Sequence, residues 1–410
     1  MSGGSLAAGQ AEARAMDFST TPEERAFRES LRSWLRDNLP LGWGTPRFPM
    51  PQEAGEKVAF ARQWAKKLHA GGWAGLGWPR AHGGRELSPL EHLMFQEEYT
   101  AAGAPSMMDF GVGPALVGPT LIAHGTDWQK ERFLEKILNG DEVWCQGFSE
   151  PGAGSDLASL STRGELDGDD LVVNGQKVWT SYARYADWCI LIVRTDPTAP
   201  KHKGLTFALV DMKTPGITIR PLVEMTGVAW FNEVFFENVR IPRRNIVGEI
   251  DRGWDITITT LSHERGTATP YARLRSEIDG AVALARRLAD DSPRLADPRV
   301  RQALAQLRIE IDILKLNVYR NVSRLMRTGI PGPEGSMIKV YWSELEQRLM
   351  QVVSELSGAY ALLDEHAPQA FDDGRWQYAY LWSRAATIYA GTSEVQRNII
   401  SQRVLGLPRS

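Results

Sequence analysis

Apolar residues recur with helical spacing near the start of the chain. Four of them, from Phe27 to Leu35, follow the i, i+4, i+7, i+8 pattern of one helix face. The run Thr-Pro-Glu-Glu at 21–24 is typical of a helix start. A second amphipathic segment spans 129–138 and ends at an Asn-Gly pair. We therefore predict a helical N-terminal domain over residues 17–140.

The spacing changes after residue 140. Short runs rich in β-branched and aromatic residues, separated by prolines, predict strands at 188–193, 205–210, 217–219 and 234–236. An Asn-Gly pair at 174–175, between Leu171–Val173 and Val178-Trp179, matches a two-residue β-hairpin. These patterns predict a compact antiparallel β domain over residues 141–245.

Helical spacing returns in the last third of the chain. Apolar residues from Leu307 to Leu325 keep this spacing for about five turns. Two prolines and three glycines at 329–335 predict a turn between two long antiparallel helices. We expect a helical C-terminal domain over 246–410, and an α+β fold that is mostly α. Residues 1–16, rich in Gly, Ala and Ser, are expected to be a disordered extension.

Composition excludes several classes of function. The 410 residues are enough for two or three domains. A formal net charge of −3 gives no basic face for nucleic acid. No run reaches the ~18–20 apolar residues of a membrane span, and no His or Cys spacing is typical of a metal site. Cys145 and Cys189 lie in apolar runs, which predicts buried free thiols and a cytoplasmic protein.

Three runs carry the candidate chemistry. Residues 145–156 read Cys-Gln-Gly-Phe-Ser-Glu-Pro-Gly-Ala-Gly-Ser-Asp. Small residues there let the backbone approach a ligand closely, and adjacent N–H groups with a serine hydroxyl can cradle an anion. The second run, at 174–181, reads Asn-Gly-Gln-Lys-Val-Trp-Thr-Ser, and the third, at 389–397, reads Tyr-Ala-Gly-Thr-Ser-Glu-Val-Gln-Arg.

Helices, a β domain and long helices, together with these runs, resemble the acyl-CoA dehydrogenase family. Further matches are Gly-Pro-Thr-Leu at 118–121, Gly-Thr-Asp-Trp-Gln-Lys at 125–130 and Phe-Asn-Glu-Val-Phe at 231–235. The resemblance implies a C-terminal four-helix bundle, FAD as cofactor, and oxidation of the Cα–Cβ bond of an acyl-CoA thioester. It also implies an electron-transferring flavoprotein as electron acceptor and a homo- or heterotetramer, or a dimer.

The resemblance also assigns site residues. It places ten of them at the FAD: Gln146, Phe148, Ser149, Gly154, Ser155, Trp179, Thr180, Ser181, Thr392 and Glu394. Ser155, Arg265 and Gly391 are expected to bind the substrate. Glu150 is interpreted as a carboxylate that stabilises the turn, and Asp156 as an acceptor for backbone N–H groups there.

The catalytic base departs from the commonest pattern. Many family members have glutamate where this chain has Ala390, and alanine cannot take a proton. The resemblance implies that the backbone N–H of Ala390 binds the thioester carbonyl, a role that does not depend on the side chain. Residues 261–265, expected to open the central long helix, resemble the isovaleryl and long-chain branches, which makes Glu264 the candidate base. His263 is a less favoured alternative.

Two further departures leave other functions open. The usual Arg-x-x-Phe-Gly segment is missing from 285–297, and a Gln-x-x-Gly-Gly element is altered at 354–358. Both elements are expected to help hold FAD. The chain is therefore also compatible with a flavin-poor partner subunit of a heteromeric dehydrogenase. A separate alternative is a flavin monooxygenase or oxidase on the same fold, which would need access for oxygen.

Overall fold

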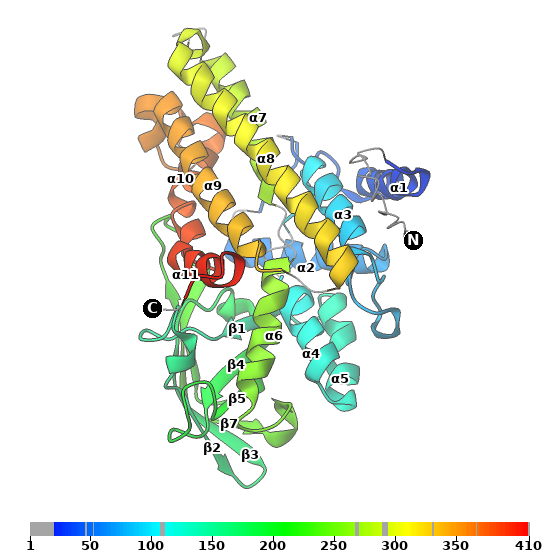
Figure 1. The fold of residues 1–410 in the computed structure, drawn as a ribbon, viewed down its shortest axis with the longest axis vertical. Coiled ribbons are helices and arrows are strands. Elements are labelled where there is room, and N and C mark those ends of the chain that lie inside the picture. The colour runs from blue at the N-terminus through cyan, green and yellow to red at the C-terminus, as the bar shows by residue number, and fades with distance from the viewer. Residues whose placement is uncertain are drawn as a thin grey trace, which may run out of the picture.

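A β-sheet built from the middle of the chain lies below the long helices of the C-terminal part (Figure 1). The computed structural model describes residues 20–45, 47–51, 53–106, 111–266, 270–288, 294–329, 332–365 and 367–408, with the backbone alone at 264–266. The predicted disordered extension at 1–16 lies outside these residues. The three-part α+β architecture is confirmed, and the domain boundaries stay predictions. Within the described residues, no helix has the length and apolar character needed to cross a membrane.

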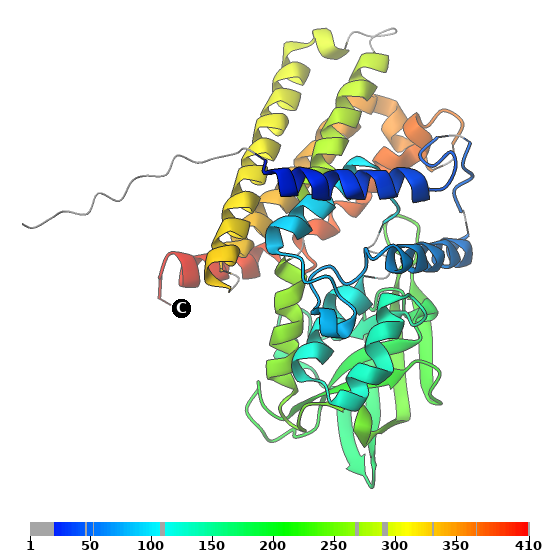
Figure 2. The same cartoon turned by 90° about the vertical axis from the view of Figure 1, so that its right-hand side faces the viewer.

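The N-terminal helices divide between the two layers. They are α1 (Pro22–Asn38), α2 (Ala54–Ala70), α3 (Pro89–Ala101), α4 (Gly118–His124) and α5 (Asp127–Leu138). Capping boxes at Thr21, Ser88 and Thr126 begin α1, α3 and α5, since each hydroxyl and the side chain three residues later satisfy free N–H groups. Helices α1 and α3 lie beside the C-terminal helices, whereas α4 and α5 lie along the sheet (Figure 2).

The sheet is mostly, but not entirely, antiparallel. Its strands are β1 (Trp144–Gly147), β2 (Arg163–Asp167), β3 (Asp170–Lys177), β4 (Trp188–Arg194), β5 (Leu205–Asp211), β6 (Ile217–Leu222), β7 (Phe231–Pro242) and β8 (Ile246–Val247). The order is β6-β7-β3-β2-β4-β5-β8, with β1 beside β4. The four predicted strands are confirmed. Strands β1 and β2 pair with β4 in parallel, which the prediction missed, and Cys145 and Cys189 lie side by side there as buried free thiols.

The hairpin predicted at 174–175 is wrong. The turn lies earlier, at Gly168 and Asp169 between β2 and β3, where Gly168 has a φ of 60°. Asn174 lies inside β3, where its side-chain oxygen accepts from the Asn238 N–H at 2.8 Å, and the ladder is irregular between residues 173 and 175. A Cβ on Gly175 would lie 2.7 Å from the Thr162 Cα, so glycine serves close strand contact there rather than a turn.

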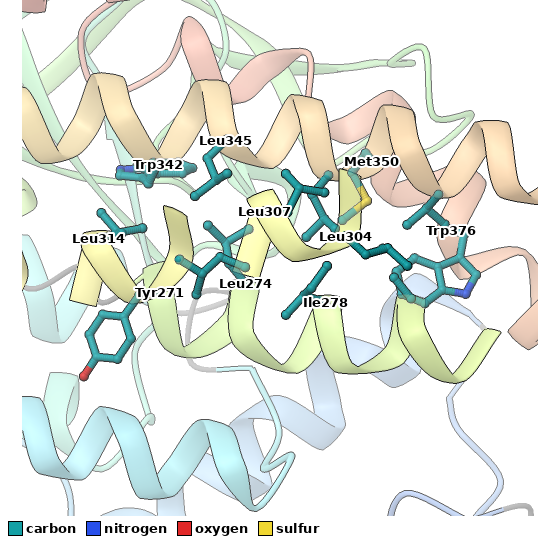
Figure 3. Packing of buried hydrophobic residues seen from close by; sticks show 14 of the residues in the cluster. Tyr271, Leu274, Ile278, Leu304, Leu307, Leu314, Trp342, Leu345, Met350 and Trp376 are labelled. Atoms are coloured by element: carbon teal, nitrogen blue, oxygen red, sulfur yellow. The ribbon is translucent and has the colours of Figure 1, made fainter. Parts of the chain in front are cut away.

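The C-terminal helices are α6 (Gly253–Gly266), α7 (Pro270–Arg287), α8 (Pro298–Thr328), α9 (Gly335–Ser357), α10 (Arg375–Trp382) and α11 (Ser393–Ile399). The predicted turn between two long helices is confirmed, since α8 ends at Gly329 with a φ of 67°. Apolar residues of α7, α8 and α9, with Trp376 of α10, share one core (Figure 3). Residues 261–265 end α6 rather than open a long helix, and α7 begins at Pro270, a residue favoured in a first turn.

A buried ion pair ties the turn after β1 to β3. Lys177 is fully buried, and its Nζ donates to Glu150 Oε1 at 2.8 Å and to the Phe148 carbonyl at 3.1 Å. Glu150 also accepts from the N–H and hydroxyl of Ser161 and from the Thr162 N–H. Burial raises the pKa of Glu150, but Lys177 and these hydrogen bonds outweigh it and hold the pKa at about 2. Glu150 is thus the turn-stabilising carboxylate that the sequence predicts.

Replacing Lys177 by methionine is expected to destabilise the protein strongly. The change leaves the Glu150 charge buried without its cation, a loss of about 3–5 kcal/mol, and lowers the melting temperature by roughly 5 °C or more. Differential scanning calorimetry at pH 7 measures this. Lys201→Met is the matched control, because it removes an exposed ion pair with Asp156 from the same turn and is expected to leave the melting temperature close to that of the parent.

The same pair predicts a dependence on acid. Because the pKa of Glu150 is lower in the folded chain than its ordinary value of 4.5, its contribution is complete above that value and is lost as pH falls toward 2. The difference in melting temperature between the parent and Glu150→Gln should therefore shrink between pH 5 and pH 2. A difference that stays constant across this window would contradict an ionised Glu150.

Candidate active site

The turn after β1 exposes its small residues. Backbone hydrogen bonds of 3.1 and 3.0 Å between Glu150 and Ala153 close the turn. Gly152 and Gly154 are exposed, have ordinary φ angles, and an added Cβ would meet nothing within 4 Å at either. Neither packing nor backbone geometry within the chain thus requires glycine there. Open space above the backbone is what close approach by a ligand needs.

The predicted site residues of this run fall on both sides of the turn. Gln146 and Phe148 lie at the end of β1, with Phe148 buried, and the Ser149 carbonyl accepts from the Val178 N–H at 2.8 Å. Ser155 is exposed on the far side. The prediction for Asp156 is wrong: its carboxylate accepts from the Ser159 hydroxyl and the Lys201 ammonium group rather than from backbone N–H groups, because it points to the surface.

Trp179 combines two unusual properties. Its φ of 60° lies in the left-handed region, which costs a bulky residue about 1–3 kcal/mol, and the residue is 60% exposed. Hydrogen bonds on either side hold this backbone: Val178 N–H bonds to Ser149, and the Thr180 N–H donates to the Asn232 carbonyl at 3.0 Å. An exposed tryptophan in a strained, firmly held backbone is typical of a binding site rather than of core packing.

The residues after Trp179 add an unsatisfied polar group. The Thr180 side chain is fully buried, and its Oγ1 has no hydrogen-bond partner among the described residues. Buried hydroxyl groups almost always have a hydrogen-bond partner. A buried hydroxyl without one indicates either that a ligand supplies the partner or that the folded protein bears the cost of the missing bond. Ser181 is half-buried beside it.

A row of aromatic rings, which the sequence prediction missed, connects the sheet to α10. Trp179 meets Phe231 edge-on at 5.9 Å, Phe231 stacks on Trp382 at 6.1 Å, and Trp382 stacks on Tyr378 at 6.3 Å, with interplanar angles of 4° and 7° for the two stacks. Trp382 and Tyr378 are one turn apart on α10. Their helical spacing is the only sequence signal, and nothing local shows that they meet Phe231.

The third run forms a strained loop that ends in α11. Ala390 has a φ of 53° and Gly391 a φ of 85°, and the Thr392 hydroxyl begins α11 by accepting from the Val395 N–H at 3.2 Å. Glu394 is exposed in the first turn of α11. The φ of Gly391 favours glycine, and an added Cβ would also lie 2.6 Å from Gln396 Nε2.

Gln396, a buried side chain that the prediction missed, holds this loop. Its Nε2 donates to the Ala390 carbonyl at 2.9 Å and to the Gly391 carbonyl at 3.5 Å. Because both partners are carbonyl oxygens, which only accept, the amide nitrogen of Gln396 rather than its oxygen must face them. Its position within the third run is the only signal in the sequence; once it is buried, a polar side chain needs a hydrogen-bond partner.

Helix α9 holds the residues that precede Ala390. Lys339 Nζ donates to the Ala386 carbonyl, and Gln347 Nε2 donates to the Ser383 carbonyl and the Thr387 hydroxyl, each at 3.1 Å. The ring of Trp342 lies 6.2 Å from that of Tyr389. The loop that presents the Ala390 N–H is therefore fixed from two helices.

The candidate base falls at the end of α6. The backbone of Glu264 and Arg265 belongs to the last turn of that helix, and their side chains are outside the described part of the structure. His263 is described: burial, with a smaller effect of His124, lowers its pKa. Helix α6 is held on α4 by the Thr120 and Thr260 hydroxyls, 2.9 Å apart, and by His124 and Thr259, also at 2.9 Å.

The structure thus joins the first two runs directly and the third indirectly. Hydrogen bonds from Val178 and Lys177 fasten the second run to the first. The third run follows α10, whose Trp382 stacks on Phe231 next to Trp179. The roles predicted for the individual residues stay predictions.

The chain matches three family models in sequence order. They are described as the N-terminal, middle and C-terminal domains of acyl-CoA dehydrogenase, and they match residues 21–141, 145–239 and 251–405.

Individual relatives agree with these matches. The chain is 41% identical over 390 residues to "Acyl-CoA dehydrogenase IpdE1" of Mycobacterium tuberculosis, which covers 93% of this chain and 97% of the relative. Its fold is similar to a solved "Tcur3481-Tcur3483 steroid ACAD" (TM-score 0.83, 31% identity, 96% and 100% coverage). It is also similar to a chain of the ChsE4-ChsE5 complex of Mycobacterium tuberculosis (TM-score 0.82, 34% identity, 96% and 100% coverage). This chain therefore belongs to the acyl-CoA dehydrogenase family.

Proposed function

We propose that this chain binds FAD and catalyses the α,β-desaturation of an acyl-CoA thioester. The observation that carries the proposal is the exposed, strained Trp179 beside a glycine turn whose open face no packing explains. The family membership supplies the reaction class. We further propose that the protein works in the cytoplasm and passes electrons to an electron-transferring flavoprotein.

The residues present fit FAD. The open backbone at Gly152 and Gly154 suits close approach by a phosphate or ring, and the buried Thr180 hydroxyl has a free hydrogen-bonding capacity. Side chains proposed to hold the cofactor are Gln146, Phe148, Ser149, Ser155, Trp179, Thr180, Ser181, Thr392 and Glu394, with the backbone of Gly154. When bound, FAD accepts the hydride that leaves the substrate Cβ.

The chain's own residues carry the proton chemistry. We propose that Glu264 removes the α proton. A thioester α proton is far too weakly acidic for a free carboxylate, so negative charge that develops on the thioester oxygen must be stabilised. The Ala390 N–H is the proposed donor, with Gly391, Arg265 and Ser155 holding the acyl-CoA. Exclusion of water by the bound substrate would make Glu264 a stronger base.

The relatives suggest the substrate and the assembly. One solved relative is described as a steroid acyl-CoA dehydrogenase, and another as a complex of two different chains. We propose a bulky, ring-containing acyl group and a heteromeric assembly. A second candidate function, a flavin-poor subunit that supports a catalytic partner, is favoured by that complex together with the altered segments at 285–297 and 354–358.

The visible spectrum of the purified chain separates these two functions. We expect a flavin band that bleaches anaerobically on adding CoA thioesters of steroid side-chain acids. A colourless protein that stays colourless after incubation with FAD would contradict FAD binding by this chain alone and would favour the partner-subunit function.

Glu264→Gln tests the base. The amide keeps the size of the side chain but cannot take a proton, so flavin content should be unchanged while the bleaching rate falls by roughly 10²- to 10⁴-fold. Glu355→Gln, an exposed residue of α9 that accepts from Gln351, is the control. Full bleaching rates in Glu264→Gln would transfer the role to another residue, with His263→Gln as the next variant.

Gln396→Leu tests the loop that presents Ala390. Loss of the bonds to two carbonyl groups frees the backbone around a donor that must be aligned in the transition state, so kcat should fall by roughly 10-fold or more with little change in KM. Gln306→Leu on the exposed face of α8 is the control. Equal losses in flavin content and activity would indicate a structural role instead.

A further inference from the structure

Helices α7 and α9 share a cluster of charged side chains that the proposed reaction does not use. Arg273 Nη1 donates to Glu277 Oε1, one turn later on α7, at 2.7 Å. The same nitrogen lies 2.8 Å from Glu346 Oε1 on α9. One guanidinium group therefore serves two carboxylates.

This cluster is surrounded by protein and yet partly accessible. The side chain of Glu346 is 3% exposed and that of Glu277 18%, but that of Arg273 is 43% exposed. The Oε2 atom of each glutamate is buried and has no hydrogen-bond partner among the described residues. Burial raises the pKa of Glu277 even though Arg273 opposes the change. Burial also acts against the charge of Arg273, but the two carboxylates outweigh it and raise its pKa.

A neighbouring arginine shows what is unusual here. Arg275, two residues along α7, is 44% exposed, and it pairs with Asp312 on α8 at the outer surface, where both side chains meet water. Arg273 is as accessible, although burial is the largest influence on its charge. Arg273 thus combines an accessible guanidinium group with two largely buried carboxylate partners, whereas the partner of Arg275 is exposed.

The charged cluster lies near the loop of Ala390. Arg273 lies close enough to Tyr389, the residue before Ala390, for the two side chains to interact electrostatically. On α9, Glu346 follows Trp342 by one turn, and Trp342 contacts Tyr389. Figure 3 shows Leu274 and Ile278 pointing from α7 into the apolar core, so Arg273 and Glu277 occupy a different side of that helix. The cluster thus lies beside the segment proposed to hold the thioester carbonyl.

The charges of this cluster determine which chemical group of a ligand could bind beside Arg273. Hydrocarbon laid over an accessible guanidinium group would remove its water without replacing the hydrogen bonds, which is unfavourable. A carboxylate would meet a cation whose charge two glutamates already offset. A hydroxyl or ketone oxygen can accept an N–H from Arg273 and brings no charge of its own.

Building on the proposed function, we propose that Arg273 binds a neutral oxygen substituent, a hydroxyl or ketone, on the acyl group of the substrate. Glu277 and Glu346 fix the direction of the guanidinium group and disfavour acyl groups that end in a second carboxylate. The substrate class is therefore CoA thioesters of oxygenated, ring-containing acids.

The test compares matched CoA thioesters with the flavin-loaded protein, together with any partner chain that copurifies. A single cyclohexane ring and a four-ring steroid skeleton are each used as the hydrocarbon, hydroxyl, ketone and carboxylate form. Dissociation constants come from the shift of the flavin spectrum, and rates from anaerobic bleaching. On at least one skeleton, we expect the ketone or hydroxyl form to bind roughly 10- to 100-fold more tightly than the hydrocarbon and carboxylate forms.

The triple variant Arg273→Met, Glu277→Gln, Glu346→Gln removes the cation together with the two carboxylates that would otherwise be left without it. It should remove this preference while hydrocarbon substrates bind as well as before or better. Arg275→Met, the control on the outer side of α7, should keep it. Preference for the hydrocarbon or carboxylate form in the parent, or an unchanged preference in the triple variant, would overturn the proposal. Bleaching by no thioester would instead contradict the proposed function, and bleaching without discrimination would contradict only the role of Arg273.

Discussion

The buried pair of Lys177 and Glu150 is the constraint on which the rest of the site depends. The turn after β1 has open space above its two glycines, which therefore add no packing to hold it. Glu150 holds it instead by accepting from Ser161, Thr162 and Lys177, which fastens the turn to the start of β2 and the end of β3. A buried ion pair is costly to desolvate, and replacing both of its members by hydrophobic residues is often as stable. The contribution of the pair here is to hold the turn in a single conformation.

The same principle operates at the two strained residues. Trp179 and Ala390 both have φ angles in the left-handed region without being glycine. Each is flanked by hydrogen bonds from buried groups, Asn232 in one case and Gln396 in the other. Strain of this kind persists only where the surroundings over-determine the backbone. Polar side chains inside the protein thus hold the donor and the aromatic surface that the proposed reaction uses.

The sequence predicted the elements whose signals are local. Capping at Thr21, strand patterns from 188 to 236 and the apolar face of α8 are all present. The prediction failed where residues distant in the sequence determine the structure. Asn174 and Gly175 have the sequence of a turn, but contacts with Asn238 and Thr162 place them inside the strand pairing of β3. Two other features have no local signal. The stack of Phe231 on Trp382 forms only when α10 meets the sheet, and the cluster around Arg273 forms only when α7 packs on α9.

Family membership fixes the class of reaction more firmly than the substrate. In the proposed reaction the thioester end needs an N–H donor and a base whatever the acyl group, whereas the rest of the acyl group would meet residues that are free to differ between relatives. An apolar acyl group would be served by apolar side chains alone. The accessible Arg273, held by two carboxylates, would have no role beside such a group, and covering it with hydrocarbon would be unfavourable. Charged groups kept beside a site are therefore the best indication of what the bound molecule carries.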